Sequence, residues 1–145
     1  MALPAFATDY LFLGTVLQAR IRAQLGEDLV VGGADELSQA VQGNLVRTGA
    51  FVVWNGERVG DSGRGGASTM LQQRWLVVLG VKNARQQAGA RNEAAGPLMA
   101  RLHQAIAGWT PEGVGRPFQR VTGPAPTYAP GAGWFPLTFS ISLSL

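Results

Sequence analysis

The C-terminal segment of the chain alternates between apolar and small polar side chains. Its apolar positions are Phe135, Leu137, Phe139, Ile141, Leu143 and Leu145, and the polar positions between them are Thr138, Ser140, Ser142 and Ser144. A period of two predicts a β-strand, from about residue 134 to residue 145, with one buried face and one polar face. The sheet that holds this strand therefore needs a second layer to cover its apolar face.

Two segments with helical spacing can supply that covering layer. The first begins at Thr8-Asp9 and ends at Gly26, and its apolar stripe is Tyr10, Leu13, Leu17 and Ile21. The second spans residues 85–109, and its stripe is Ala95, Leu98, Leu102, Ile106 and Trp109. Because proline is costly inside a helix, we expect this second helix to kink or restart at Pro97. A shorter helix is expected over residues 35–42.

The remaining strands are predicted from β-rich runs and turn residues. Residues 50–54 (AFVVW) precede Asn55-Gly56, which supplies the positive φ angles of a two-residue hairpin turn. Residues 57–60 are therefore expected to form the returning strand of a hairpin. The run WLVVLGV within residues 71–82 is typical of a strand covered on both faces. Short strands are expected at residues 29–31 and 118–121.

Together these elements predict a single α+β domain over residues 1–145. Its sheet is expected to be mostly antiparallel or mixed, with the two main helices packed on one face. A chain of 145 residues is long enough to bury one substantial core without a second domain.

The composition favours a subunit of a larger assembly over a monomer. Only 14% of the residues are charged and 46% are hydrophobic, against about 25% charged in a typical soluble protein. So few charges cover an isolated surface poorly, which favours burial of part of that surface by neighbouring subunits. A small, apolar monomer is the less favoured alternative.

The net charge of +3 raises nucleic-acid binding as a further alternative. The arginines are scattered along the chain, however, and no run of five to eight basic residues marks a polyanion-binding arm. The alternative stays open because a basic face can still assemble when the chain folds.

The residue types required for catalysis or metal binding do not cluster in the sequence. Cysteine is absent, and His103 is the only histidine; general-base work by a histidine needs an orienting partner, which the sequence does not suggest. We therefore expect no catalytic, cofactor-binding or metal site, and a protein that is not an enzyme. The N-terminus is interpreted as part of the first helix rather than a signal peptide, and the apolar run at residues 75–81 is too short to span a membrane.

A glycine-rich segment, GDSGRGGAST at residues 60–69, is expected to be a mobile loop or a hairpin arm. It does not match a phosphate-binding P-loop, because Gly66 and Ala67 stand where Lys and Ser/Thr are required. Arms of this kind often become ordered on binding a neighbour. We therefore select Asp61, Arg64 and Ser68 as candidate assembly contacts.

The polar face of the last strand supplies two more candidate assembly contacts, Ser140 and Ser142. If the apolar row packs under the helices, the Ser/Thr row must meet water, a pore or another subunit.

Three stretches in the second half of the chain resemble the tail terminator (tail completion) proteins of long-tailed bacteriophages and Mu-like prophages. They are QQRWLVVLGVKN (72–83), GPLMARLHQAIAGWTP (96–111) and RVTGPAPTYAPGAGWFPLTFSISL (120–143). The shared pattern is a buried strand, a helix ending in Gly-Trp-x-Pro, a short strand ending in Gly-Pro, and an aromatic Pro/Gly turn before an alternating last strand.

This resemblance implies a structural virion protein that assembles into a ring, usually of six copies, at the head-proximal end of the tail tube. Such a ring stops tube polymerisation and joins the tail to the capsid neck. Its implied partners are other copies of the chain, the major tail tube protein and a neck or head-completion protein, with phage DNA passing through without sequence-specific binding. The implied location is the virion tail, after assembly in the bacterial cytoplasm, without a membrane or a cofactor.

Two alternatives to a tail terminator remain open at this point. One is another head–tail connector or a tail-tube subunit of the same machine. The other, from a different class, is a small arginine-rich nucleic-acid-binding protein, for which duplex affinity should fall steeply with salt.

Overall fold

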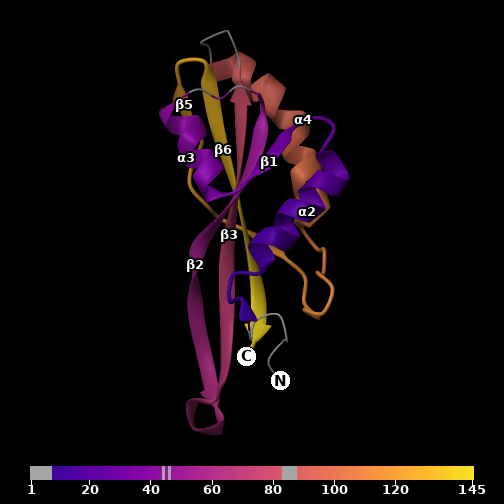
Figure 1. Cartoon of the computed structure of the whole chain (residues 1–145), viewed down its shortest axis with the longest axis vertical. Helices are drawn as coiled ribbons and strands as arrows, with labels where there is room; N and C mark the ends of the chain where they lie inside the picture. Colours follow the sequence, from indigo (N-terminus) through magenta and orange to yellow (C-terminus); the bar gives the residue numbers. More distant parts are fainter. Residues whose placement is uncertain (1–7, 44, 46, 83–87) are drawn as a thin grey trace.

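The computed structural model describes residues 8–43, 45, 47–82 and 88–145, and side chains within 88–92 are not described. Over these residues the chain combines three α-helices with a six-stranded sheet (Figure 1). The elements in chain order are α2 (Leu13–Leu25), β1 (Val30–Gly32), α3 (Ala34–Gln42), β2 (Gly49–Gly63), the 3-10 turn η1 (Arg64–Gly66), β3 (Ser68–Lys82), α4 (Ala88–Ile106), β4 (Gln119–Val121), β5 (Thr127–Ala129) and β6 (Ala132–Ser144).

The sheet has the strand order β1-β2-β3-β6-β4, and β5 pairs with the beginning of β6. β1 pairs with β2 in parallel, and every other pairing is antiparallel. The long strands β2, β3 and β6 form the centre of the sheet, and β6 pairs with β3 over the whole of its length, from Ala132 to Ser144. The prediction of an α+β fold with a mostly antiparallel, mixed sheet is confirmed.

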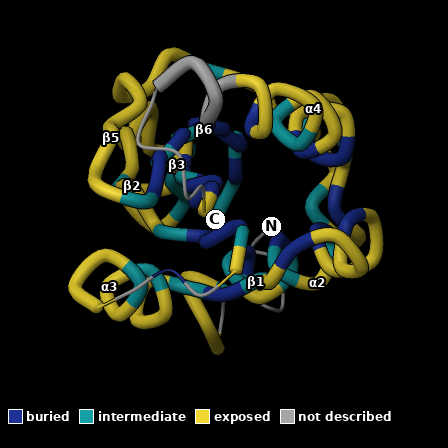
Figure 2. The backbone as a smooth tube through the Cα atoms, turned by 90° about the horizontal axis from the view of Figure 1, so that it is seen from above, coloured by how far each residue is buried: buried dark blue, intermediate teal, exposed yellow. Residues whose placement is uncertain are grey.

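Helices α2 and α4 cover one face of the sheet, and α3 lies against part of the opposite face (Figure 2). Leu13, Leu17, Ile21 and Leu25 of α2 are all buried in the main core. On the other side, Leu37 and Ala40 of α3 pack against a small cluster of Leu45, Phe51 and Ala132. The sequence predicted the two main helices on one face, and the structure adds a third helix on the other.

The apolar row of β6 forms the centre of the main core, as the alternation predicted. Phe135, Leu137, Phe139, Ile141 and Leu143 are all at most 4% exposed. Phe139 pairs in register with Trp75 of β3, and Leu137 pairs with Val77. Because paired residues point to the same side of an antiparallel sheet, both strands present one continuous apolar surface to α2 and α4.

The polar row of β6 is less open than its sequence indicates. Thr138 is 1% exposed and Ser140 is 5% exposed, whereas Ser142 and Ser144 are half-buried. The chain after β4 covers Thr138, since a Cβ built on Gly123 would lie 2.0 Å from its Oγ1. Only the part of the row nearer the C-terminus is therefore available to water or to another subunit.

The predicted hairpin turn at Asn55-Gly56 is wrong. β2 runs through these residues, and its register against β3 shifts between Trp54 and Glu57. Gly56 has φ of 90°, so the positive φ that the sequence indicated is present, but it forms a β-bulge within one long strand. The chain reverses later, at η1, so the glycine-rich segment forms the end of a hairpin arm.

Most of the other predicted elements are confirmed with shifted boundaries. Short strands occur at β1 and β4, and a helix occurs at α3. The first helix begins at Leu13 rather than at Asp9, because Tyr10 lies in a preceding turn. The second long helix continues through Pro97 without restarting, and its predicted beginning at residue 85 lies outside the described residues.

Candidate assembly interface

β2 and β3 extend past the helices as a two-stranded arm, which we define as residues 57–73. The arm projects from the body of the molecule toward the lower end of Figure 1. Every residue from 57 to 67 is exposed. β6 accompanies β3 only as far as Leu145, which exchanges two 2.9 Å backbone hydrogen bonds with Thr69. The end of the arm therefore extends as an unsupported hairpin.

The turn at the end of the arm uses three successive residues with positive φ. These angles are 51° at Arg64, 65° at Gly65 and 99° at Gly66. Glycine adopts this conformation easily, whereas a side chain with a Cβ is disfavoured there. Arg64 is the one non-glycine residue with positive φ in the described parts of the chain. The turn thus presents an exposed guanidinium at the furthest point of the arm.

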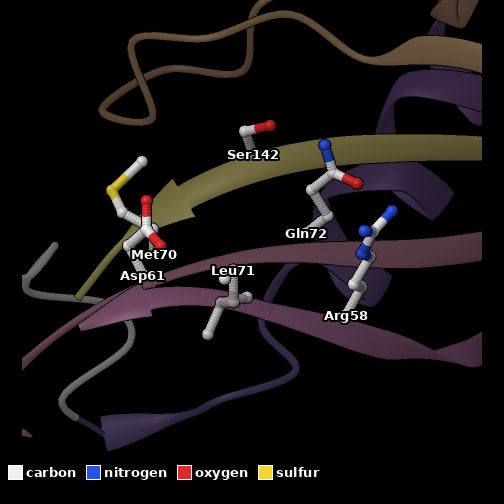
Figure 3. Close-up of a pocket in the computed structure, with 7 residues that line it drawn as sticks. Arg58, Asp61, Met70, Leu71, Gln72 and Ser142 are labelled. Atoms are coloured by element: carbon white, nitrogen blue, oxygen red, sulfur yellow. The ribbon is translucent and has the colours of Figure 1, made fainter.

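The structure separates the candidate assembly contacts into two groups. Arg64 and Ser68 lie at the end of the arm. Asp61 of the arm and Ser142 of β6 lie nearer the body of the molecule, where they line a shallow hollow of about 320 Å³ with Arg58, Met70 and Gln72 (Figure 3). Ser140 lies two residues before Ser142 on β6 and is nearly buried. The sequence identified the arm but could not show that β6 forms one side of this hollow.

A buried glutamine, which the sequence analysis did not select, ties the N-terminal turn to the base of the arm. Gln73 is fully buried; its Nε2 donates to the Tyr10 carbonyl at 2.9 Å, and its Oε1 accepts from Trp75 Nε1 at 3.1 Å. The Tyr10 hydroxyl donates to a carboxylate oxygen of Glu57 on β2. Gln73 lies between Leu71 and Trp75 on the apolar side of β3, and that period of two was the signal available in the sequence.

The contact between Tyr10 and Glu57 predicts a specific alkaline response. Burial and then the neighbouring Glu57 carboxylate raise the pKa of Tyr10 from 10.0 to about 12. Because the folded pKa lies above the unfolded one, the stabilisation is complete below pH 10 and is lost as the pH rises toward 12. In thermal melts we expect the Tm of the native protein to fall more steeply over this range than that of Tyr10→Phe. Parallel profiles for the two proteins would contradict the assignment.

The sheet has two unpaired edges beside the arm. Among the described residues, β2 has β1 on its outer side only at Gly49–Phe51, so its edge from Val52 onward is free of strand partners. On the opposite side, β4 and β5 pair with β6 only as far as Ser140, so no strand from the described part of the chain lies along the edge from Ile141 to Ser144. Unpaired strand edges can pair with strands of another chain.

The described residues do not assemble the side chains of a metal site, since no three His, Asp or Glu residues are grouped closely enough. His103 is exposed on α4, with its ring centroid 6.4 Å from that of Phe139. In the described part of the chain, no helix has the length and apolar character that crossing a membrane requires. The structural features for which a function remains to be assigned are thus the arm, its hollow and the unpaired edges of the sheet.

Comparison with known proteins agrees with an assembly role. The family model described as "Phage tail terminator protein" matches residues 7–145. No curated protein matches the chain significantly. The family is one of structural rather than enzymatic proteins, located in the phage tail and associated with other tail and head proteins. Since the match covers nearly the whole chain and not only the second half, this protein belongs to the phage tail terminator family.

Proposed function

We propose that this protein forms a closed ring of six copies that caps the head-proximal end of the tail tube and stops its polymerisation. The ring would contact the major tail tube protein on one side and a neck or head-completion protein on the other, after assembly in the host cytoplasm. Family membership supports the tail role. In this proposal the protein works through assembly alone, without catalysis and without a cofactor.

The arm is the observation that carries this proposal. Its residues 57–67 are all exposed, so they bury little apolar surface within one subunit and contribute little to its stability. Trp54 and Val59 on β2 are also 40% and 59% exposed. Apolar side chains on a strand that has one unpaired edge favour contact with another protein.

The two free edges favour a ring over a symmetric dimer. A closed ring requires each subunit to present two different surfaces, one to each neighbour. The β2 edge and the Ile141–Ser144 edge of β6 are such a pair of different surfaces, and they lie on opposite sides of the same sheet. We therefore propose that the β2 edge of one copy contacts the β6 side of the next, with Asp61, Arg64, Ser68, Ser140 and Ser142 at or near the contacts.

Shortening the arm provides the test. Residues 63–68 are replaced by Asn-Gly, which joins the paired residues Ser62 and Thr69 through a two-residue turn and keeps the Thr69–Leu145 hydrogen bonds. We expect the Tm to stay within a few degrees of the native value, since the removed segment is exposed or half-buried. Capping of tubes assembled from the major tail tube protein, measured as tube length by negative-stain microscopy, should be lost.

The possible outcomes separate the role of the arm from the role of the protein. Native protein that never limits tube length would refute the terminator function. Native protein that caps tubes, together with a shortened variant that caps equally well, would retain that function and refute the role of the arm. Long polymers formed by this protein alone would instead identify a tail-tube subunit. Arg64→Ala is the milder companion variant, and we expect weaker capping with unchanged stability.

A further inference from the structure

The sheet face opposite α2 and α4 carries a polar surface that α3 does not cover. The pairing registers place Arg58, Gln72 and Ser142 side by side across β2, β3 and β6, and Arg74, Ser140 and Gln119 side by side across β3, β6 and β4. We call this set the polar belt: Arg58, Gln72, Arg74, Gln119, Ser140 and Ser142. The α3 cluster covers the same face only nearer the other end of the strands, around Phe51 and Trp134.

The polar belt has two positive charges, and the one acid that lines the hollow beside Arg58 is Asp61, which is not part of the belt. Arg58 and Arg74 are both exposed, and neither forms an ion pair within the described residues. Figure 3 shows Arg58 and Gln72 on neighbouring strands, while Asp61 lies with Met70 at the far end of the hollow. Gln72 and Gln119 are exposed amides and Ser142 is a half-buried hydroxyl, all able to donate hydrogen bonds, whereas Ser140 is nearly buried. The belt therefore offers donors and positive charge to an anionic partner.

The spacing of the two arginines suits a repeating anion. Arg58 is paired with Gln72, and Arg74 is two residues further along the same strand as Gln72. The two Cα atoms are thus roughly 7 Å apart along the strand direction and one strand apart laterally. Guanidinium groups bind phosphate oxygens through two parallel hydrogen bonds. Two such groups at this spacing can contact separate phosphates of one backbone.

The belt fits nucleic acid better than it fits a protein surface. The exposed large apolar side chains of the described residues are Tyr10, Leu11, Val30, Val41, Trp54, Val59 and Tyr128, and none of them belongs to the belt. Protein–protein interfaces are enriched in aromatic residues and methionine at their centre, whereas protein–DNA interfaces are more polar and much more positively charged. The apolar side chains that line the hollow beside Arg58 are Met70, which is half-buried, and Leu71, which is buried. Charge complementarity without a fully exposed apolar anchor indicates a polyanion.

We propose that the polar belt binds the phosphate backbone of double-stranded DNA, with Arg58 and Arg74 as the phosphate contacts. The contact carries no sequence information, because base edges are not needed for it. This inference rests on the proposed function in one respect: a ring would set several belts around one duplex. The belt itself is complete within a single chain, so DNA binding can be tested apart from tube capping.

The test measures binding of a short random-sequence duplex to the purified native protein at several salt concentrations. Each phosphate contact contributes about −0.9 to the slope of log K against log salt. The double variant Arg58→Gln/Arg74→Gln should therefore bind more weakly, with a slope reduced in magnitude by about 2 per bound subunit. The double variant Arg58→Lys/Arg74→Lys keeps the charge and should retain most of the slope.

A matched control removes the same charge elsewhere. Arg47 and Arg116 are exposed and lie outside the belt, so Arg47→Gln/Arg116→Gln should leave the slope nearly unchanged. Equal losses in the two glutamine variants would overturn the proposal, as would native protein without duplex binding at low salt. Belt variants that keep DNA binding but lose self-association would also overturn it, since the face would then meet another subunit. Tube capping by the same proteins reports separately on the proposed function.

Discussion

Truncating Leu79 or Leu102 to alanine is expected to lower the free energy of unfolding by about 2–5 kcal/mol. Both side chains are fully buried in the main core, Leu79 on β3 and Leu102 on α4. Each truncation removes apolar contacts and leaves a cavity between the sheet and its helix layer, where rigid packing allows little collapse. Equilibrium denaturation with a chemical denaturant measures the loss.

The control for these core truncations is Arg64→Ala. Arg64 is exposed at the end of the arm, so its removal should change the free energy of unfolding by no more than about 0.5 kcal/mol. Equal losses at Leu79 and Arg64 would contradict the division between a packed body and an unsupported arm. A folded Arg64→Ala protein that caps tubes poorly would instead be the expected result for an assembly contact.

Replacing Gly123 by alanine is expected to destabilise the protein by about 1–3 kcal/mol through overpacking. A Cβ at this position would lie 2.0 Å from Oγ1 and 2.9 Å from Cβ of Thr138. Rotation of the Thr138 hydroxyl can relieve the first contact, but its Cβ is fixed on β6 between β3 and β4. The segment after β4 must therefore lift from the sheet, which a lower Tm would report.

Gly96→Ala provides the matched control for this substitution. Gly96 is an exposed position within α4, and a Cβ there would meet nothing within 4 Å. Alanine is favoured over glycine inside a helix by about 1 kcal/mol, but the ring of Pro97 disfavours a helical residue with a Cβ directly before it, so this variant should change the stability little. A Gly123→Ala protein that melts at or above the native temperature would show that the segment after β4 is not packed on Thr138.

The arm illustrates why a correct local signal can predict the wrong element. Asn55-Gly56 requires positive φ, and both a two-residue hairpin turn and a β-bulge satisfy that requirement. The bulge forms because β3 pairs with β2 on both sides of it, from Gly49 to Gly63. This pairing is made with residues further along the chain, so no window around Asn55 contains the information. The position of the reversal, at η1, follows from the same pairing.

The candidate interface was predictable in part for the same reason. Glycine enrichment at residues 60–69 was sufficient to expect an exposed arm, since backbone freedom is a local property. The hollow and the polar belt depend on register, because Ser142 on β6 is brought beside Gln72 and Arg58 only by pairing across three strands. The same limit explains why the scattered arginines did not indicate a basic face in the sequence.

The amino-acid sequence was sufficient to predict the α+β class, the helical and strand periods, the apolar row of β6 and the resemblance to tail terminators. These properties depend on neighbouring residues, and hydrophobic periodicity reports them directly. Four features became visible only in the folded chain: the full length of β2, the burial of Thr138 and Ser140, the anchoring of Tyr10 by Gln73, and the grouping of Arg58 with Arg74. Strand register and layer packing join distant parts of the chain, and their free energy depends on contacts that exist only after folding.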